Sequence, residues 1–281
     1  MDSIKCKICN YQLSKKVMTF DKPDAVEIAA NVDVKDYERN YYLCDNCGVY
    51  QSDLAYHFIE NSQYNKNYYE HADPEKIEHK FNRVMSMTRE QSDNWQRVER
   101  ILENVNKYRK YFNLCRGTSL LDIGAGTGVF IAKYSQLAKN WTCTALEPDA
   151  HACKHLRKNL QADVIEDVFS PELKTSKYDL LTLNRVLEHF PEPLDMIKIV
   201  PLFLKPEGLV YLELPDTNSL YCYGKENEAF GSAHLTIFDI KTLLILFENA
   251  GLFPLQIGRF KEPSGKLTVF GFATIKKILY D

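Results

Sequence analysis

A stretch near the middle of the chain joins an acidic side chain to closely spaced glycines. Asp122 follows an apolar run that begins at Leu120, and three alternate glycines come directly after it, at Gly124, Gly126 and Gly128. Glycine is needed where φ turns positive or where a ligand approaches the backbone, so the pattern predicts a buried strand, a tight loop and the start of a helix. A dinucleotide fingerprint would place its third small residue at Val129. A carboxylate at the strand end also favours a cationic group over a pyrophosphate.

A second carboxylate stands at the spacing that a doubly wound fold uses for a ribose. Residues 141–146 form an apolar run that ends at Glu147, which lies 21 residues beyond Gly126. A carboxylate suits a ribose because it accepts hydrogen bonds from both hydroxyls of a diol. An acid in this position can instead cap the following helix, and that role fits Asp149 better than Glu147.

The acid followed by G-x-G-x-G resembles the first motif of the class I S-adenosylmethionine-dependent methyltransferases. The resemblance implies that Asp122 lies close to the methionyl part of the cofactor. It also implies that the backbone of Gly124, Gly126 and Gly128 packs against the cofactor. A glycine-rich turn of some other α/β protein is the alternative.

Later segments extend this resemblance. Asp167 matches the segment that borders adenine in the family, although its neighbour is equally acidic. Asn184 and Arg185 end an apolar run, and the resemblance places them beside the methionyl end of the cofactor. The Val-Leu-Glu-His segment that follows is frequent in members that act on small molecules. Its Glu188 and His189 are expected to serve the substrate, with capping and packing as the alternative.

Methylation of a hydroxyl or of an enolisable carbon also needs a base. His234 is the first candidate, because imidazole titrates near neutrality and its segment resembles the substrate-side histidine motif of the sugar C-methyltransferases; His189 is the second. In those enzymes a glutamate precedes the histidine and a tyrosine lies three positions before it, whereas this chain has Ala233 and Gly231. The difference favours methylation of oxygen over carbon. A packing role is the alternative for His234.

Four of the eight cysteines form two C-x-x-C pairs near the N-terminus, namely Cys6, Cys9, Cys44 and Cys47. The 34 residues between the pairs allow a separate folded excursion. Two such pairs supply the four thiolates of a closed tetrahedral zinc site, which has no open position and therefore predicts a role in folding rather than catalysis. Two unrelated pairs are one alternative. A redox motif is the other, although it would need only one pair.

The run from Cys44 to Tyr50, with the tyrosines after it, resembles the zinc-binding module that precedes the methyltransferase domain in a group of bacterial enzymes. That group includes C-methyltransferases of deoxysugar-nucleotide pathways and enzymes from surface-polysaccharide gene clusters. The resemblance implies a tyrosine-rich lid over the cleft; packing of the zinc module onto the main domain is the alternative. The lid candidates are Tyr64, Tyr68 and Tyr69. An insert at residues 217–234 is expected to shape the acceptor pocket with Tyr221 and Tyr223.

The elements that would position these residues alternate between apolar runs and helical patterns. Strands are expected near 120–123, 141–146, 162–167, 178–184, 209–214, 252–260 and 266–274, and helices within 74–112, 129–137 and 236–250. This order predicts an α/β, doubly wound, mainly parallel seven-stranded Rossmann-like fold. The expected organisation is a zinc-binding module at 1–60, a connector or lid at 61–117, and a domain that binds S-adenosylmethionine at 118–281.

Charge and hydropathy exclude several classes of partner. The formal net charge of −3 supplies no general attraction to nucleic acid. No apolar run approaches the roughly 18 residues of a membrane span, and the first residues lack the apolar core of a signal peptide. The remaining cysteines show no pairing pattern and are expected to be reduced thiols, which favours a cytoplasmic protein.

The leading hypothesis is a methyltransferase that uses S-adenosylmethionine and a structural zinc, and acts on a carbohydrate or nucleotide-sugar. An RNA base methyltransferase with a zinc ribbon is the second hypothesis, and it predicts salt-sensitive RNA binding. The third is a non-catalytic partner protein that binds S-adenosylmethionine without turnover.

Overall fold

The computed structural model describes residues 4–13, 15–29, 32, 35, 37–54 and 74–277. Its strands are β1 (Lys15–Phe20), β2 (Arg39–Leu43), β3 (Tyr50–Ser52), β4 (Ser119–Ile123), β5 (Thr142–Leu146), β6 (Asp163–Ile165), β7 (Tyr178–Asn184), β8 (Leu204–Pro215), β9 (Thr236–Ile237), β10 (Phe253–Lys261) and β11 (Leu267–Thr274). Its helices are α1 (Ala25–Ala29), α4 (Pro74–Met85), α5 (Asp93–Phe112), α6 (Val129–Leu137), α7 (Ala150–Asn159), η2 (Leu187–His189), α8 (Pro193–Lys198), α9 (Val200–Phe203), α10 (Ser219–Tyr223), η3 (Glu228–Phe230) and α11 (Ile240–Asn249).

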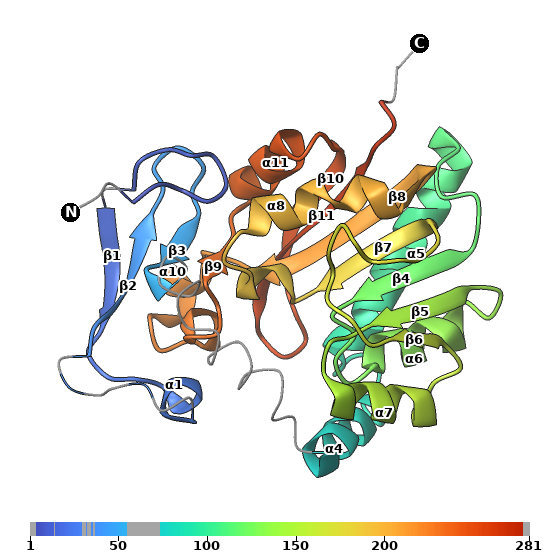
Figure 1. The fold of residues 1–281 in the computed structure, drawn as a ribbon, viewed down its shortest axis with the longest axis horizontal. Helices are drawn as coiled ribbons and strands as arrows, with labels where there is room; N and C mark the ends of the chain where they lie inside the picture. Colours follow the sequence, from blue (N-terminus) through green and yellow to red (C-terminus); the bar gives the residue numbers. More distant parts are fainter. Residues whose placement is uncertain are drawn as a thin grey trace.

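The main sheet has seven strands in the order β10-β11-β8-β7-β4-β5-β6 (Figure 1). Strands β8, β7, β4, β5 and β6 run parallel, whereas β11 pairs antiparallel with both β8 and β10. The predicted Rossmann-like α/β fold with a mainly parallel seven-stranded sheet is therefore confirmed. Because the five parallel strands end at one edge, every loop that follows them contributes to the same side of the molecule.

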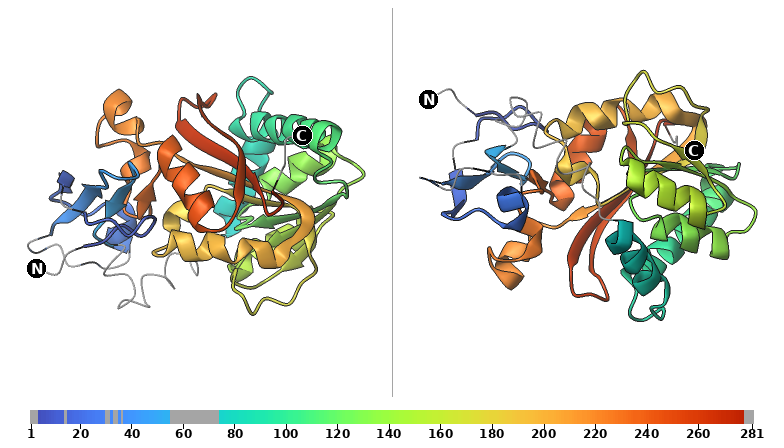
Figure 2. Two further views of the ribbon diagram at one scale, coloured as in Figure 1. Left: turned by 90° about the horizontal axis from the view of Figure 1, so that it is seen from above. Right: turned by 60° about the horizontal axis from the view of Figure 1, so that its bottom comes forward.

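Helices cover both faces of this sheet (Figure 2). Neighbouring residues of a strand point to opposite faces, so Leu120 and Leu121 enter different hydrophobic clusters. Leu120 lies in the cluster that contains the buried residues of α5 and α6, and Leu121 in the one that contains those of α8 and α11. The near-continuous apolar runs in the sequence reflect burial on both faces.

A smaller sheet, in the order β1-β2-β3-β9, lies beside the main one (Figure 1). Its last strand, β9, lies where the sequence predicts the first residues of a helix over 236–250. The N-terminal end of that prediction is wrong. Residues Thr236–Ile237 pair with β3, and the helix begins only at Ile240. Asp239 caps it, because its side chain accepts a hydrogen bond from Lys241 N and its own N–H donates to Thr242.

The N-terminal residues share a core with the main sheet. Cys6, Ile8 and Cys47 belong to the same hydrophobic cluster as Leu243 and Phe247 of α11. Two hydrogen bonds fix the contact: Thr242 donates to Cys47 O at 2.7 Å, and Asn249 donates to Ile8 O at 2.9 Å. The predicted boundaries near residues 60 and 117 remain predictions.

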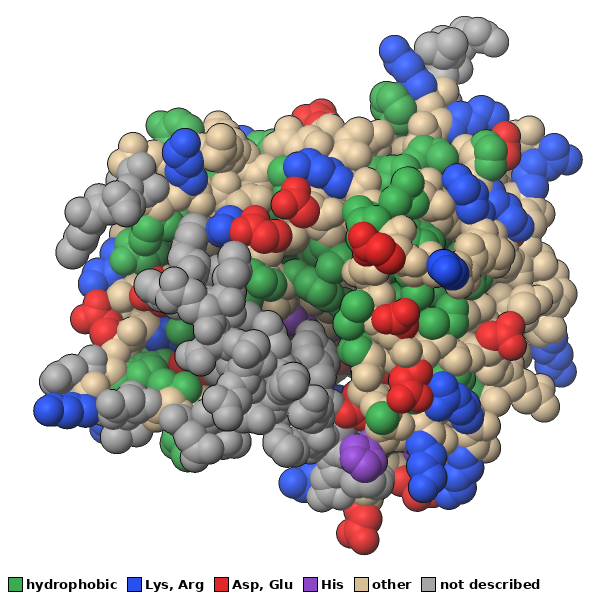
Figure 3. Space-filling model, viewed as in Figure 1, with side chains coloured by type: hydrophobic (Ala, Val, Ile, Leu, Met, Phe, Trp, Pro, Cys, Tyr) green, Lys and Arg blue, Asp and Glu red, His purple; other side chains and the backbone are tan. Residues whose placement is uncertain are grey.

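The charged side chains of one face are visible in a space-filling view (Figure 3). Side chains of both charge signs occur together over the face shown in Figure 3. Among the described residues, no helix combines the length and the apolar character that a bilayer crossing requires.

Candidate functional site

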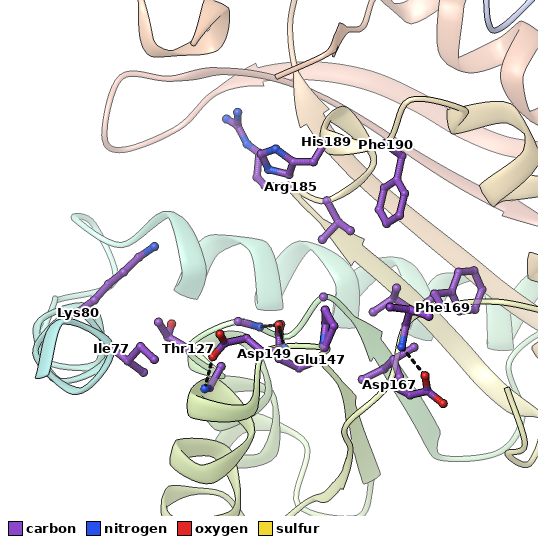
Figure 4. A pocket seen from close by; sticks show the side chains of 18 residues that line it. Ile77, Lys80, Thr127, Glu147, Asp149, Asp167, Phe169, Arg185, His189 and Phe190 are labelled. Carbon is purple, nitrogen blue, oxygen red and sulfur yellow. Dashed lines mark hydrogen bonds between the residues drawn. The ribbon is translucent and has the colours of Figure 1, made fainter. Parts of the chain in front are cut away.

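A cavity of about 420 Å³ opens at the carboxyl edge of the parallel strands. This volume lies within the range typical of small-molecule sites. Its lining comes from the loops after β4, β5, β6 and β7 and from α4, and Figure 4 shows two walls facing each other. One wall carries Glu147 and Asp149, and the other carries Arg185, His189 and Phe190.

The glycine loop after β4 forms part of the floor. Gly126 lines the cavity with a left-handed backbone (φ +54°), and a Cβ built there would meet no neighbouring atom closer than 4.0 Å. Any side chain at this position would therefore occupy space that a ligand could use. Gly124 also lines the cavity, whereas Gly128 does not, because it begins α6 and packs against Leu156.

Glu147 is held rigidly at the end of β5. Its Oε2 accepts a hydrogen bond from Gly126 N at 2.7 Å, and its Oε1 accepts one from Asp149 N at 3.0 Å. Burial raises the pKa of Glu147, and these two backbone donors oppose the shift. The side chain of Asp149 caps α7 by accepting from Ala152 N at 2.6 Å, which confirms the capping role expected for Asp149.

Asp122 and Asn184 lie together behind the glycine loop. Asp122 is 2% exposed, and its Oδ1 accepts hydrogen bonds from Thr182 at 2.7 Å and from Asn184 at 2.9 Å. Burial raises the pKa of Asp122 to about 7, against the effect of these two donors. The Oδ1 atom of Asn184 is buried and has no partner among the described residues. Neither side chain is part of the cavity lining.

Arg185 occupies a strained position at the start of the opposite wall. Its φ of 59° is in the left-handed region, which is uncommon for a residue with a side chain. The backbone N–H donates to Glu213 O at 2.9 Å, and the guanidinium donates to Thr268 Oγ1 at 2.9 Å. These bonds hold the conformation that turns the next residues, including Val186 and His189, toward the cavity.

His189, His234 and Glu188 form a cluster on this wall. The two imidazole rings lie 5.0 Å apart between centroids, and the Nδ1 atoms face Ala233 O at 2.8 Å and Ala229 O at 3.0 Å. Burial lowers the pKa of His234 to about 3, and the positive charges of His189 and Arg185 add to this shift. Glu188 is completely buried, and burial raises its pKa. His189 lines the cavity, whereas Glu188 and His234 lie behind it.

Other predicted site residues fall at different distances from the cavity. Asp167 lines it, while its neighbour Glu166 pairs with Arg157 at 2.8 Å. Tyr221 and Tyr223 of α10 do not line it: Tyr221 is 78% exposed, and the Tyr223 hydroxyl donates to a carbonyl at the β10–β11 turn. The role of both tyrosines in the acceptor pocket stays a prediction. The proposed lid residues lie outside the described residues, and these are Tyr64, Tyr68 and Tyr69.

Sequence reasoning missed the contribution of α4. Ile77 and Lys80 of this helix line the cavity beside Thr127, and Figure 4 shows Lys80 at its rim. The signal was a lysine one turn after an isoleucine within residues 74–85, a spacing that puts both side chains on one face of a helix, although Lys80 itself is exposed. Val168, Phe169 and Phe190 add apolar lining that no motif indicated.

The four N-terminal cysteines converge away from this cavity. Their sulfur atoms all lie within 4.8 Å of one another, with Cys6 and Cys47 at 3.6 Å and Cys9 and Cys44 at 3.5 Å. A tetrahedron with zinc–sulfur bonds of about 2.3 Å has edges of about 3.8 Å, so the arrangement fits such an ion. No disulfide joins any of them.

Residues 69–257, more than half of the chain, match a family model described as a methyltransferase domain. A protein of Hydrogenovibrio crunogenus named ubiquinone biosynthesis O-methyltransferase is 24% identical over 162 residues, covering 56% of this chain and 67% of that protein. A protein of Actinobacillus pleuropneumoniae with the same name is 31% identical over 104 residues, covering 34% of this chain and 44% of that protein. The matched region thus spans less than half of the second relative.

Solved structures share the fold. The plantazolicin methyltransferase BpumL, in complex with SAH, has a TM-score of 0.55 and 15% identity, and the match covers 75% of this chain and 93% of that chain. The 1,6-didemethyltoxoflavin-N1-methyltransferase of Burkholderia thailandensis, with 1,6-didemethyltoxoflavin and S-adenosylhomocysteine bound, has a TM-score of 0.53 and 14% identity, over 93% of this chain and 99% of that chain. At these identities the likeness concerns the fold alone.

Proposed function

Because the chain belongs to the family of methyltransferase domains, and so to the enzyme class predicted from its sequence, we propose that it transfers a methyl group from S-adenosylmethionine to an oxygen of a small molecule. The observation that carries this proposal is the two-walled cavity of Figure 4. A carboxylate fixed by Gly126 N stands on one wall, and an imidazole faces it from the other. The carboxylate can bind the hydroxyls of a ribose, and the imidazole can contact an acceptor.

The residues present fit the cofactor. The open space above Gly126 accepts a ligand against the backbone, and Glu147 keeps lone pairs for the two ribose hydroxyls. Asn184 and Asp122 do not line the cavity, but the buried, unpartnered Oδ1 of Asn184 and the negative charge of Asp122 would favour the ammonium of the methionyl end over an anion on that side. Asp167 and Phe169 would border the adenine, and Lys80 at the rim suits the carboxylate.

The reaction needs an aligned nucleophile in a site that excludes water. Bound S-adenosylmethionine supplies an electrophilic methyl group, which an acceptor oxygen attacks while the carbon–sulfur electron pair returns to sulfur. Because the Nδ1 atoms of His189 and His234 face carbonyl oxygens, we assign their hydrogens to Nδ1. His234 and His189 stay the predicted catalytic residues. Of the two, His189 lines the cavity, whereas His234 lies behind it with a pKa of about 3, which makes its imidazole a weak base.

Oxygen is favoured as the methylated atom by the names of the relatives, which are O-methyltransferases. The carbohydrate or nucleotide-sugar acceptor rests on the resemblance of the cysteine module and the histidine segment, and no relative reported above is named for a sugar. The proposed zinc rests on the geometry of the four sulfur atoms. An RNA substrate is less favoured, because the formal net charge is −3 and the face in Figure 3 carries side chains of both charge signs.

The test is binding followed by turnover. Isothermal titration with S-adenosylhomocysteine should show one binding site per chain. Glu147→Ala should lower the affinity for this ligand by about 10- to 100-fold, because one or two charge-assisted hydrogen bonds to the ribose are lost. Glu166→Ala is the matched control, since Glu166 lies outside the cavity on a surface ion pair. Absence of binding by the folded wild-type protein would refute the proposal. Binding without transfer to any hydroxylated acceptor would favour the non-catalytic alternative.

A further inference from the structure

An arginine lies in the wall of the cavity without a carboxylate beside it. Arg185 lines the cavity and is half-buried, and its guanidinium donates to Thr268 Oγ1 at 2.9 Å. Apart from this neutral hydroxyl, the guanidinium forms no ion pair with any of the described residues. A guanidinium has five N–H donors, so a ligand in the cavity could accept hydrogen bonds from those that Thr268 does not use.

Three acids near this guanidinium do not neutralise it. Glu213 accepts from two arginines of α5, one of which lies 2.8 Å from its Oε2. Glu262, whose Oε1 lies 3.5 Å from Thr268 Oγ1, is buried, and burial raises its pKa to about 8. Burial also raises the pKa of Glu188, against the nearby positive charges. The first acid is thus already paired, and burial favours the neutral form of the other two.

Backbone and side-chain contacts hold Arg185 in this place. Its φ is 59°, and its N–H donates to Glu213 O at 2.9 Å. Thr268, a buried residue of β11, holds the far end of the side chain. Figure 4 shows Arg185 beside His189 on the wall that faces Glu147, so a guanidinium and an imidazole lie together on one wall.

The charged residues that line the cavity are separated by sign. Three acids, Glu147, Asp149 and Asp167, lie on one wall, and Arg185 lies on the opposite one. S-adenosylmethionine is positive at its sulfonium and at its ammonium and negative at its carboxylate, so its net positive charge suits the acidic wall. An unpaired arginine on the opposite wall therefore indicates an anionic group on the other ligand.

A lysine of the β10–β11 turn adds positive charge on this side. Burial lowers the pKa of His234 to about 3, and the charges of His189, Arg185 and Lys266 add to this shift. Lys266, however, pairs with Glu228 at 2.7 Å, and both side chains are exposed. Arg185 rather than Lys266 is therefore the cation that a ligand would meet on this wall.

We propose that the acceptor carries an oxyanion, a carboxylate or a phosphate, and that Arg185 binds this group with Thr268 as its positioning residue. This inference rests on the proposed methyl transfer. A planar guanidinium presents two parallel N–H donors that match the oxygens of either oxyanion. An acceptor held in this way would have its remaining atoms beside His189, which lines the same wall.

The methionyl carboxylate of the cofactor is the competing oxyanion. The sequence resemblance places Arg185 beside the methionyl end, whereas Lys80 at the rim is the cation assigned above to that carboxylate. Two ligands distinguish the sources, because S-adenosylhomocysteine has the methionyl carboxylate and 5′-methylthioadenosine lacks it. A cation that binds the cofactor carboxylate contributes to the affinity of the first ligand alone.

The first experiment compares acceptors in matched pairs: hexose 1-phosphates with methyl hexosides, and uronic acids with their methyl esters. Transfer is measured with labelled S-adenosylmethionine, and binding by calorimetry with protein saturated with S-adenosylhomocysteine. The wild type should prefer the anionic member of one series by at least about tenfold, since a charge-assisted hydrogen bond is worth about 1.5 to 3 kcal/mol. The series that shows the preference identifies the oxyanion as phosphate or carboxylate.

Variants test the residues in the same assay. Arg185→Gln should reduce the preference to about twofold, mainly by raising KM, and Arg185→Lys should retain part of it. Thr268→Val keeps the guanidinium but removes its hydroxyl partner, so KM for the anionic member should rise several-fold with kcat unchanged. Arg83→Gln is the control, because it removes an exposed arginine of α4 that does not line the cavity, and it should keep the preference.

The second experiment titrates S-adenosylhomocysteine and 5′-methylthioadenosine into the same proteins. Affinity for both should stay within about twofold of the wild type in Arg185→Gln. A loss of at least about tenfold for S-adenosylhomocysteine alone would assign Arg185 to the methionyl carboxylate and overturn the proposal. So would equal binding and transfer of both members of every pair by a wild type that binds the cofactor. Failure of the wild type to bind S-adenosylhomocysteine would instead refute the proposed function.

Discussion

The buried carboxyl group of Asp122 lowers the stability of the folded protein at neutral pH, although its charge would favour a cationic ligand. Its carboxyl group is 2% exposed, and burial raises its pKa to about 7. The unfolded chain has the ordinary value of about 3.9, so the folded protein holds more protons than the unfolded chain between pH 4 and 7. Stability from this group is therefore present at low pH and is lost as the pH rises through 7. A cationic ligand bound nearby would lower the pKa of Asp122 and so stabilise its ionised form.

The variant Asp122→Asn should separate these effects. It keeps an acceptor for Thr182 and Asn184 but removes the charge, so the free protein should be more stable than the wild type at pH 8, by up to about 4 kcal/mol at about 1.4 kcal/mol per pKa unit. The gain should shrink toward pH 4. Affinity for S-adenosylmethionine should fall by about 10- to 100-fold. Thermal unfolding and calorimetry across this pH range would check both.

If Asp122→Asn loses affinity for S-adenosylmethionine but is no more stable than the wild type at pH 8, then ionisation of Asp122 does not destabilise the folded protein. Thr182→Val offers a matched control. It removes one of the two donors to Asp122 and should raise the pKa of that carboxyl further, which moves the stability change to higher pH.

At the scale of elements, the smaller sheet holds the segment that carries His234. The Tyr41 hydroxyl of β2 donates to His234 O at 2.6 Å and lies 3.1 Å from Gly231 O. Arg39 donates to Phe230 O at 2.9 Å, and Asp24 accepts from Ser232 N at 2.6 Å. The backbone on both sides of the histidine is therefore fixed by residues of the N-terminal region.

The variant Tyr41→Phe should weaken this hold without a large loss of packing. Removing the hydroxyl should cost about 1 kcal/mol of stability and leave a carbonyl partly unsatisfied. If His234 acts on the acceptor side, kcat should fall several-fold while cofactor affinity stays unchanged. The pH profile of kcat should also shift, because the position of the imidazole changes. Tyr11→Phe, at an exposed tyrosine of the same region, should change none of these.

The sequence predicted correctly the elements that depend on neighbouring residues, and it missed those that depend on residues distant in the sequence. The strand, glycine loop and helix at residues 119–137 depend on local rules, and the sequence alone placed them closely. The strand at Thr236–Ile237 forms only because β3, nearly two hundred residues earlier, pairs with it. Lys80 reaches the cavity because α4 packs beside α6 and α7. Contacts that depend on such distant partners leave no periodic signal in one sequence.

At the scale of the whole molecule, the cysteine cluster joins two parts of the chain into one core. Cys6, Cys44 and Cys47 are at most 3% exposed and pack in the cluster that contains Leu243 and Leu246. Four thiolates held close together repel one another unless a cation neutralises them. A zinc ion at this point would thus stabilise α11 and β3, and through β3 the strand β9 that follows His234.

We therefore expect metal loss to act on the whole chain rather than on the N-terminal region alone. Elemental analysis should show that Cys9→Ser has lost one bound zinc per chain. Its melting temperature should fall by about 5 to 15 °C, which for a protein of this size corresponds to a few kcal/mol of stability. Because the cluster and α11 share one core, the variant should still unfold in a single transition monitored at the two tryptophans, Trp95 and Trp141, and by circular dichroism. Cys222→Ser, at an exposed cysteine, is the control and should match the wild type. Two separate transitions, with the methyltransferase region melting as it does in the wild type, would mean that the cysteine module folds independently and does not support the segment that carries His234.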